Sequence, residues 1–269
     1  MYAAFNLINV RDVFNNGVPM NTYAEYYKVL NDMDISATRS SLSKYLLNDV
    51  IIDGKLMSED WFPQIKADVF LSHSHLDKEY AYAIAGWLNV NFGLKVFVDS
   101  AIWGCADELL SEIDNKYCMT GRGYYSYVNR NISTAHIHMM LSTALLKMID
   151  KTECLFFLNT ENSSTTQLSN CINGSTTYSP WIYSEIAIAN CIRRDRKREG
   201  VIFESARDSA EIRKYIAVYP IELEGFPIIT STLLDNWRRS KVKDTRKIHS
   251  LDILYGIVLG KWGDHYGVQ

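Results

Sequence analysis

The chain has 269 residues, of which 47% are hydrophobic and 22% are charged, and its formal net charge is −3. This composition is typical of an ordinary globular protein and provides no global attraction to nucleic acid or to anionic membranes. We expect no signal peptide, because no apolar run follows a basic start, and no membrane-spanning helix. The five cysteines are scattered without a CxxC pair, which favours reduced thiols and a cytoplasmic location.

Residues 1–66 predict a small, mostly helical N-terminal extension without a chemical motif. After it, an apolar run ends in Ser72 and His73, and a second run ends in Asp99. Both runs are typical of buried parallel strands, and the segment between them has the periodicity of a helix. The resulting βαβ unit consists of a strand at 67–72, a helix starting at 77 and a strand at 94–99.

The rest of the chain continues this alternation of strands and helices. We expect an irregular insertion around 119–135, then a helix, a third buried strand and a long polar loop. The later elements are strand candidates at 201–203 and 216–223 and a C-terminal helix at 248–259. The sequence therefore predicts an α/β fold with a doubly wound, mostly parallel sheet and helices on both faces. We place this domain at 67–225, with a helical part at 226–269 packing on it.

One helix carries the main candidate for chemistry. Ser179 is a preferred N-cap residue and Pro180 is favoured at the first helical position. If the helix starts there, one of its faces carries Trp181, Glu185, Ile188 and Ile192. A glutamate is rarely buried on such a stripe unless it is paired or functional. The alternative is that Glu185 is a surface residue on a helix whose buried face is rotated from this one.

The ends of three predicted strands converge with this helix. Ser72 and His73 follow the first strand, Asp99 and the loop through Trp103 follow the second, and the third leads to the Glu185 helix. In parallel sheets, ligands bind beyond the carboxyl ends of the strands. The sequence therefore predicts a polar, aromatic and acidic site at one edge of the sheet.

Four segments in this order resemble the TIR (Toll/interleukin-1 receptor) domains of bacteria. They are DVFLSHS at 68–74 with DKE at 77–79, VFVD at 96–99, the loop at 100–106, and the Trp181-x-x-x-Glu185 pair after the third strand. The resemblance implies a TIR/flavodoxin-like fold and, at Glu185, the catalytic glutamate of enzymatic TIR domains. The long insertion and the 66 residues before the first motif depart from a minimal TIR domain.

The resemblance implies that NAD+ is the substrate and that its nicotinamide–ribose bond is cleaved, with no additional cofactor. Glu185 would bind the ribose hydroxyls with Trp181 packed beneath it, while Ser72 and His73 line the floor and Asp99 and Trp103 the loop side. The family further implies self-association through TIR–TIR contacts. It also implies a product derived from ADP-ribose that signals to a separate effector protein, as in Thoeris-type anti-phage defence.

Several alternatives remain open at this stage. Trp181 is equally explained as a core aromatic, Asp99 as a strand-end turn former, and Trp103 as a contact to a neighbouring subunit. His136 and His138 point to different faces of a helix, so we expect no metal site. At the level of function, the alternatives are a non-catalytic TIR scaffold and, more remotely, a nucleoside-modifying transferase.

Overall fold

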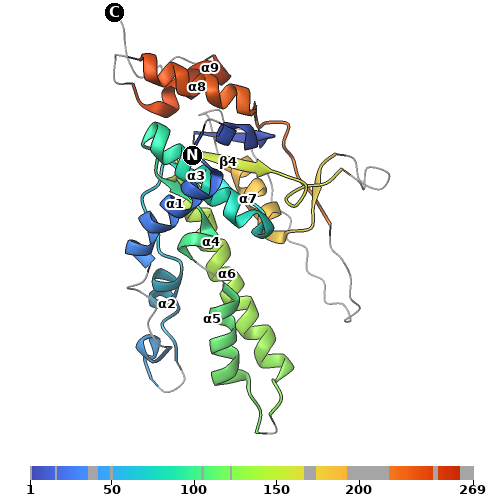
Figure 1. The fold of residues 1–269 in the computed structure, drawn as a ribbon. Coiled ribbons are helices and arrows are strands. Elements are labelled where there is room, and N and C mark those ends of the chain that lie inside the picture. Colours follow the sequence, from blue (N-terminus) through green and yellow to red (C-terminus); the bar gives the residue numbers. More distant parts are fainter. Residues whose placement is uncertain are drawn as a thin grey trace, which may run out of the picture.

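The computed structural model contains a five-stranded parallel sheet with helices on both faces, as the sequence predicts (Figure 1). None of the helices in the described part of the chain combines the length and apolar character that crossing a bilayer requires. The structure describes residues 2–15, 17–35, 42–48, 51–103, 106–121, 123–166, 174–192, 218–244 and 248–260.

All neighbouring strands of the main sheet are parallel. In spatial order they are β3 (Val96–Phe97), β2 (Val69–Ser72), β4 (Cys154–Asn159), β1 (Ala3–Ile8) and β7 (Ile228–Ile229). The side chains of β4 alternate between two separate hydrophobic clusters, with Phe156 in one and Phe157 in the other. Since successive side chains of a strand point to opposite faces, both faces of the sheet are buried.

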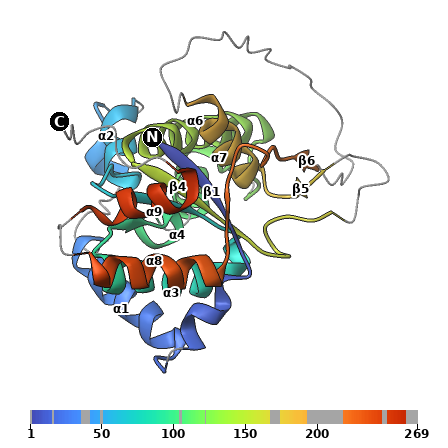
Figure 2. The same cartoon turned by 90° about the horizontal axis from the view of Figure 1, so that it is seen from above.

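Each hydrophobic cluster is completed by its own set of helices (Figure 2). The face of Phe5 and Phe156 is covered by α1 (Met20–Ile35), α3 (Lys78–Phe92), α8 (Ser231–Lys243) and α9 (Ser250–Leu259). The face of Phe157 is covered by α2 (Gly54–Trp61), α5 (Ala106–Ile113), α6 (Tyr127–Lys151) and α7 (Pro180–Cys191).

The first strand of the sheet comes from the segment expected to be a helical extension. β1 pairs with β4 along its whole length, from Ala3 opposite Cys154 to Ile8 opposite Asn159. The expectation that residues 1–66 form a helical appendage is therefore wrong at this strand. Because β7 pairs with the other side of β1, the sheet also extends beyond residue 225. One sheet thus spans the three predicted segments, and the boundaries at 66 and 225 do not separate independent units.

The predicted insertion is mainly a helical hairpin. α5 runs into a π-helical turn, η4 (Asp114–Cys118), and α6 returns after a short turn in which Met119 bridges to Tyr125. The expectation of irregular structure over 119–135 is therefore correct only for its first part, because α6 begins at Tyr127. Figure 1 shows α5 and α6 running side by side away from the sheet.

The remaining elements are short. Thr176–Thr177 (β5) and Tyr219–Pro220 (β6) form a separate antiparallel pair, so the strand candidate at 216–223 does not join the main sheet. The candidate strand at 201–203 lies outside the described residues. The short helical turns are η1 (Val10–Asn15), η2 (Leu42–Tyr45), η3 (His75–Asp77) and α4 (Asp99–Ile102).

The position of β1 leads to a test of stability. Phe5 is fully buried between the sheet and α9, with its ring edge-on to Phe156 and stacked with Tyr255. We expect Phe5→Ala to lower the free energy of unfolding by about 3–5 kcal/mol, because it opens a cavity in the core. Val29→Ala, at a residue of α1 that is 59% exposed, should change it by at most about 0.5 kcal/mol in the same urea titration. Equal, small effects would mean that the N-terminal segment is peripheral.

A second test concerns the close approach of α1 and α3. A Cβ atom added at Gly86 on α3 would lie 2.2 Å from the carbonyl oxygen of Tyr23 on α1. We expect Gly86→Ala to destabilise the protein by about 1–3 kcal/mol or more, because the backbone of α1 must move away. Gly121→Ala is the matched control, since nothing lies within 4 Å of its added Cβ. Thermal unfolding of both variants measures the difference, and similar midpoints would contradict the packing described here.

Candidate functional site

The helix that carries Glu185 starts where the sequence predicts. Ser179 is its N-cap, with Oγ accepting a hydrogen bond from the Ile182 N–H at 3.3 Å, and Pro180 is the first helical residue. The fully buried face consists of Ile182, Glu185, Ile186 and Ala189. The predicted stripe was therefore rotated slightly, because Trp181 is only partly buried. Glu185 belongs to both stripes, and it is only 3% exposed.

A serine at the end of β2 holds the buried carboxylate. Ser72 Oγ donates a hydrogen bond to Glu185 Oε2 at 2.6 Å, and both side chains are buried. These residues lie 113 positions apart in the sequence and meet because β2 and β4 are neighbours in the sheet. The chain leaving β2 forms α3 on one face, and the chain leaving β4 forms α7 on the other. Such a switch point opens a crevice at the carboxyl ends of the strands.

The electrostatic environment of Glu185 disfavours its charge. Burial raises the pKa of Glu185 well above its usual range, and the negative charge of Asp99 raises it further. The hydrogen bond from Ser72 acts in the opposite direction, because it stabilises the ionised form. Desolvation dominates, so this carboxyl group retains its proton at higher pH than an exposed glutamate does.

His73 and Asp99 form the neighbouring part of the site. His73 Nε2 lies 3.1 Å from Ser100 Oγ, while Nδ1 lies 3.4 Å from the carbonyl oxygen of Leu71 and 3.6 Å from Asp99 Oδ1. Since Nδ1 faces two acceptors, the assignment that fits places the proton there and lets Nε2 accept from the Ser100 hydroxyl. Asp99 Oδ1 also accepts the Ser100 N–H at 2.7 Å, so Asp99 is both a turn former and a site residue.

Glu185 opens onto a cavity of about 360 Å³. Its walls come from the chain after β2, from α4 with Trp103, from the start of α5, from α6 and from the start of α7. The cavity is lined by Phe62, His73, His75, Asp99, Ser100, Trp103, Ala106, Asp107, His138, Leu141, Leu145, Ser179, Pro180, Trp181 and Glu185. These described lining residues include three carboxyl groups and three histidines but no lysine or arginine. The cavity is therefore suited to a ligand whose deeper end is neutral or positively charged.

The two predicted tryptophans line this cavity in different ways. Trp181 stands edge-on to His138, with ring centroids 5.3 Å apart, and forms a partly buried wall. Trp103 is only 2% exposed, and its Nε1 donates to the carbonyl oxygen of Pro63 at 2.9 Å. Trp103 therefore lines the loop side of the site as expected, while its burial argues against the alternative of a contact to a neighbouring subunit. This side chain is anchored in the core and presents only part of its ring to the cavity.

The structure brings all six predicted site residues together, although Ser72 is not among the residues lining the cavity. It supports Glu185 from behind instead of forming the floor. The sequence analysis did not find Ser100 or His138. Ser100 follows Asp99 directly, so a strand-end signal was available for it. For His138 no local signal existed, because only the packing of α6 against α7 brings it to this edge.

Among the described residues, no group of three or more histidine, cysteine, aspartate or glutamate side chains is arranged to hold a metal ion. What the arrangement can provide is a desolvated carboxylate. Once ionised, that group would stabilise a positive charge developing beside it far more strongly than a carboxylate in water.

The raised pKa of Glu185 predicts how stability depends on pH. Below the usual glutamate range the carboxyl is protonated in both the folded and the unfolded state. As the pH rises above that range, the unfolded state ionises first, so the wild type loses up to about 1.4 kcal/mol of stability per pH unit until the folded-state pKa is passed. Glu185→Gln should not show this loss, because its amide never ionises.

Chemical denaturation across this pH range measures the effect. The free energy of unfolding of Glu185→Gln, relative to that of the wild type, should increase with pH. The free energy of unfolding of Glu112→Gln, at an exposed residue of α5, should change with pH as that of the wild type does. Parallel curves for wild type and Glu185→Gln would show that position 185 is not desolvated in solution.

The resemblance to TIR domains depends on short motifs and on the place of Glu185 after the strand that ends at Asn159. One of these motifs, Trp181-x-x-x-Glu185, belongs to the helix whose carboxyl group opens onto the cavity. Comparisons with family models, with curated proteins and with solved structures find no match for this chain.

Proposed function

We propose that the chain cleaves the nicotinamide–ribose bond of NAD+. The observation that carries this proposal is the carboxyl group of Glu185, which is 3% exposed, hydrogen-bonded by Ser72 and open to a cavity without a lysine or arginine among its described lining residues. A buried carboxylate without a cation is costly, and a positively charged substrate group compensates for that cost. The nicotinamide end of NAD+ carries such a charge on its ring nitrogen.

The chemistry of this bond matches a site with one buried carboxylate. Ordinary glycosidases need a carboxylic acid to protonate the leaving oxygen. Nicotinamide instead leaves from a cationic nitrogen as a neutral molecule, taking the bonding electrons with it, so no acid is required. The ribose becomes an oxocarbenium-like cation until water or an internal nucleophile adds to it. Glu185 would bind the ribose hydroxyls and stabilise this cation.

The raised pKa of Glu185 is compatible with this role. Before substrate binds, the proton would offset the cost of burial, and Asp99 adds to the negative potential. When a cationic ring enters, its charge favours the ionised carboxylate, so the proton is released as the substrate binds. The site would thereby favour the substrate cation over the neutral nicotinamide product.

The size of the cavity limits which part of NAD+ it holds. A volume of about 360 Å³ is enough for a base with its sugar but not for a whole dinucleotide. Trp181 and the partly presented ring of Trp103 would provide flat apolar walls for the base. Because the described lining offers no lysine or arginine, we place the pyrophosphate and the adenosine outside the cavity.

The wider role follows from the resemblance to TIR domains. We propose that the protein works in the cytoplasm of a bacterium and makes an ADP-ribose-derived signal during anti-phage defence. A separate effector protein would respond to that signal, and self-association through TIR–TIR contacts would accompany activity. These steps are part of the same proposal and depend on NAD+ cleavage.

Incubation with NAD+ tests the proposal, with the protein alone and together with lysate of phage-infected cells. Chromatography should resolve free nicotinamide for the wild type. Glu185→Gln should lower its rate of release at least about a hundredfold, because the amide cannot neutralise the ribosyl cation. Glu112→Gln is the matched control and should act like the wild type.

Two other results would contradict the assignment. Equal nicotinamide release by wild type and Glu185→Gln would remove Glu185 from the chemistry. If neither the wild type nor Glu185→Gln released nicotinamide, with or without infected lysate, the result would favour a TIR scaffold that acts only through protein contacts.

A further inference from the structure

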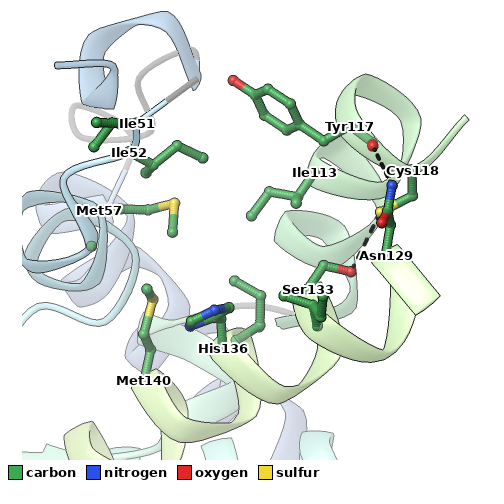
Figure 3. A pocket seen from close by; sticks show the side chains of 13 residues that line it. Ile51, Ile52, Met57, Ile113, Tyr117, Cys118, Asn129, Ser133, His136 and Met140 are labelled. Carbon is green, nitrogen blue, oxygen red and sulfur yellow. Dashed lines mark hydrogen bonds between the residues drawn. The ribbon is translucent and has the colours of Figure 1, made fainter. Parts of the chain in front are cut away.

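A second cavity, of about 620 Å³, lies beside α6 at a distance along the helix from the candidate site. It opens between the segment at 51–57 and the hairpin of α5 and α6 (Figure 3). No residue that the structure describes lines both cavities. His136 and His138 show the separation most simply, because each points from the same helix into a different cavity.

The described lining of this second cavity is mainly apolar and includes no lysine, arginine, aspartate or glutamate. Aliphatic and sulfur-containing side chains dominate it, and Met57 and Met140 face each other across one end (Figure 3). The described lining residues are Ile51, Ile52, Gly54, Met57, Ile113, Tyr117, Cys118, Asn129, Ile132, Ser133, His136, Ile137 and Met140. A charged ligand would lose its hydration here without a counter-ion, so the lining selects against ions and nucleotides.

The polar side chains on the η4 and α6 side of this cavity hydrogen-bond to one another. Cys118 Sγ lies 3.7 Å from Ser133 Oγ, and Ser133 Oγ donates to Asp114 Oδ1 at 2.6 Å. Arg130 Nε also binds Asp114, at 2.8 Å. This network satisfies the buried carboxylate of Asp114 and gives the cavity a rigid wall.

Two further polar side chains belong to this lining. The hydroxyl of Tyr117 is shielded from water and has no hydrogen-bond partner among the described residues. His136 projects into the cavity beside Met140 (Figure 3), but it is an exposed residue, so water can bind its ring. A buried hydroxyl without a partner is costly, and a ligand acceptor that the Tyr117 hydroxyl reached by a small turn of its ring would remove that cost.

We propose that this cavity binds a neutral, mainly apolar small molecule with a hydrogen-bond acceptor. Its volume is in the range of small-molecule sites, and the flexible methionines allow the walls to adapt to a flat ring system. A ligand here would wedge the 51–57 segment against the hairpin. The proposal does not depend on NAD+ cleavage, because the two cavities have separate sets of described lining residues.

Titration with prodan tests the proposal, because this dye is neutral, has two fused rings and a carbonyl acceptor, and emits at shorter wavelength in apolar sites. The wild type should bind it saturably with one site per chain. Met140→Trp and Ile52→Trp fill the cavity from opposite walls and should each weaken binding at least about tenfold. Met139→Trp is the matched control, since Met139 is 65% exposed and does not line the cavity.

Competition then tests the preference for neutral ligands. Acetylnaphthalene should displace prodan, whereas naphthoate, which has the same rings but a negative charge, should be at least about tenfold weaker. Glu185→Gln should bind prodan like the wild type. A failure of the ligand-binding proposal is therefore distinguishable from a failure of the proposal that Glu185 cleaves NAD+. Absence of saturable binding, equal binding by both cavity-filling variants and the wild type, or equal competition by naphthoate would overturn the proposal. Circular dichroism of each variant establishes that it is folded.

Discussion

The parallel pairing of β2 with β4 is the constraint on which the candidate site depends. In this register Ser72 lies opposite Phe157, so β2 ends beside the carboxyl end of β4. The connections from the two strands leave to opposite faces of the sheet, and the crevice between them is where Ser72 meets Glu185. A shift by one residue would turn Ser72 to the other face and separate the two groups.

The same arrangement explains how a costly group is tolerated. α7 buries Ile182, Ile186 and Ala189 in the hydrophobic cluster on the Phe157 face of the sheet, and this apolar burial holds the helix in place. Glu185 lies on that face and cannot leave the crevice unless the helix turns. Burial of an uncompensated carboxyl group lowers stability, and such local costs are common where a site is organised in advance for its ligand.

Local patterns in the sequence predicted some elements well. β2 and β4 are uninterrupted apolar runs, and α7 carries the Ser179 cap with Pro180 after it, so neither prediction needed knowledge of distant contacts. β1 was missed because the polar Asn6 interrupts a short run, and because its partner strand begins at Cys154, far along the chain. Its place in the middle of the sheet follows from long-range pairing alone.

The candidate site was likewise only partly predictable from the sequence. Glu185 was identifiable because helical spacing sets its neighbours within one element. The environment of Trp103 was not, since its burial depends on the carbonyl of Pro63 and on the rings of Phe62 and Phe97. The α6 wall of the first cavity and the whole of the second cavity were equally inaccessible to sequence reasoning, because both require α6 to pack against segments that local patterns do not connect to it.

The most direct measurement is a carbon-13 NMR titration of the Glu185 carboxyl group, assigned by its loss in Glu185→Gln. The account predicts that Glu185 titrates well above the usual range of a glutamate. It also predicts that Ser72→Ala moves this pKa higher still, because the hydrogen bond that stabilises the charge is lost. A Glu185 pKa like that of an exposed glutamate, unchanged by Ser72→Ala, would contradict the account.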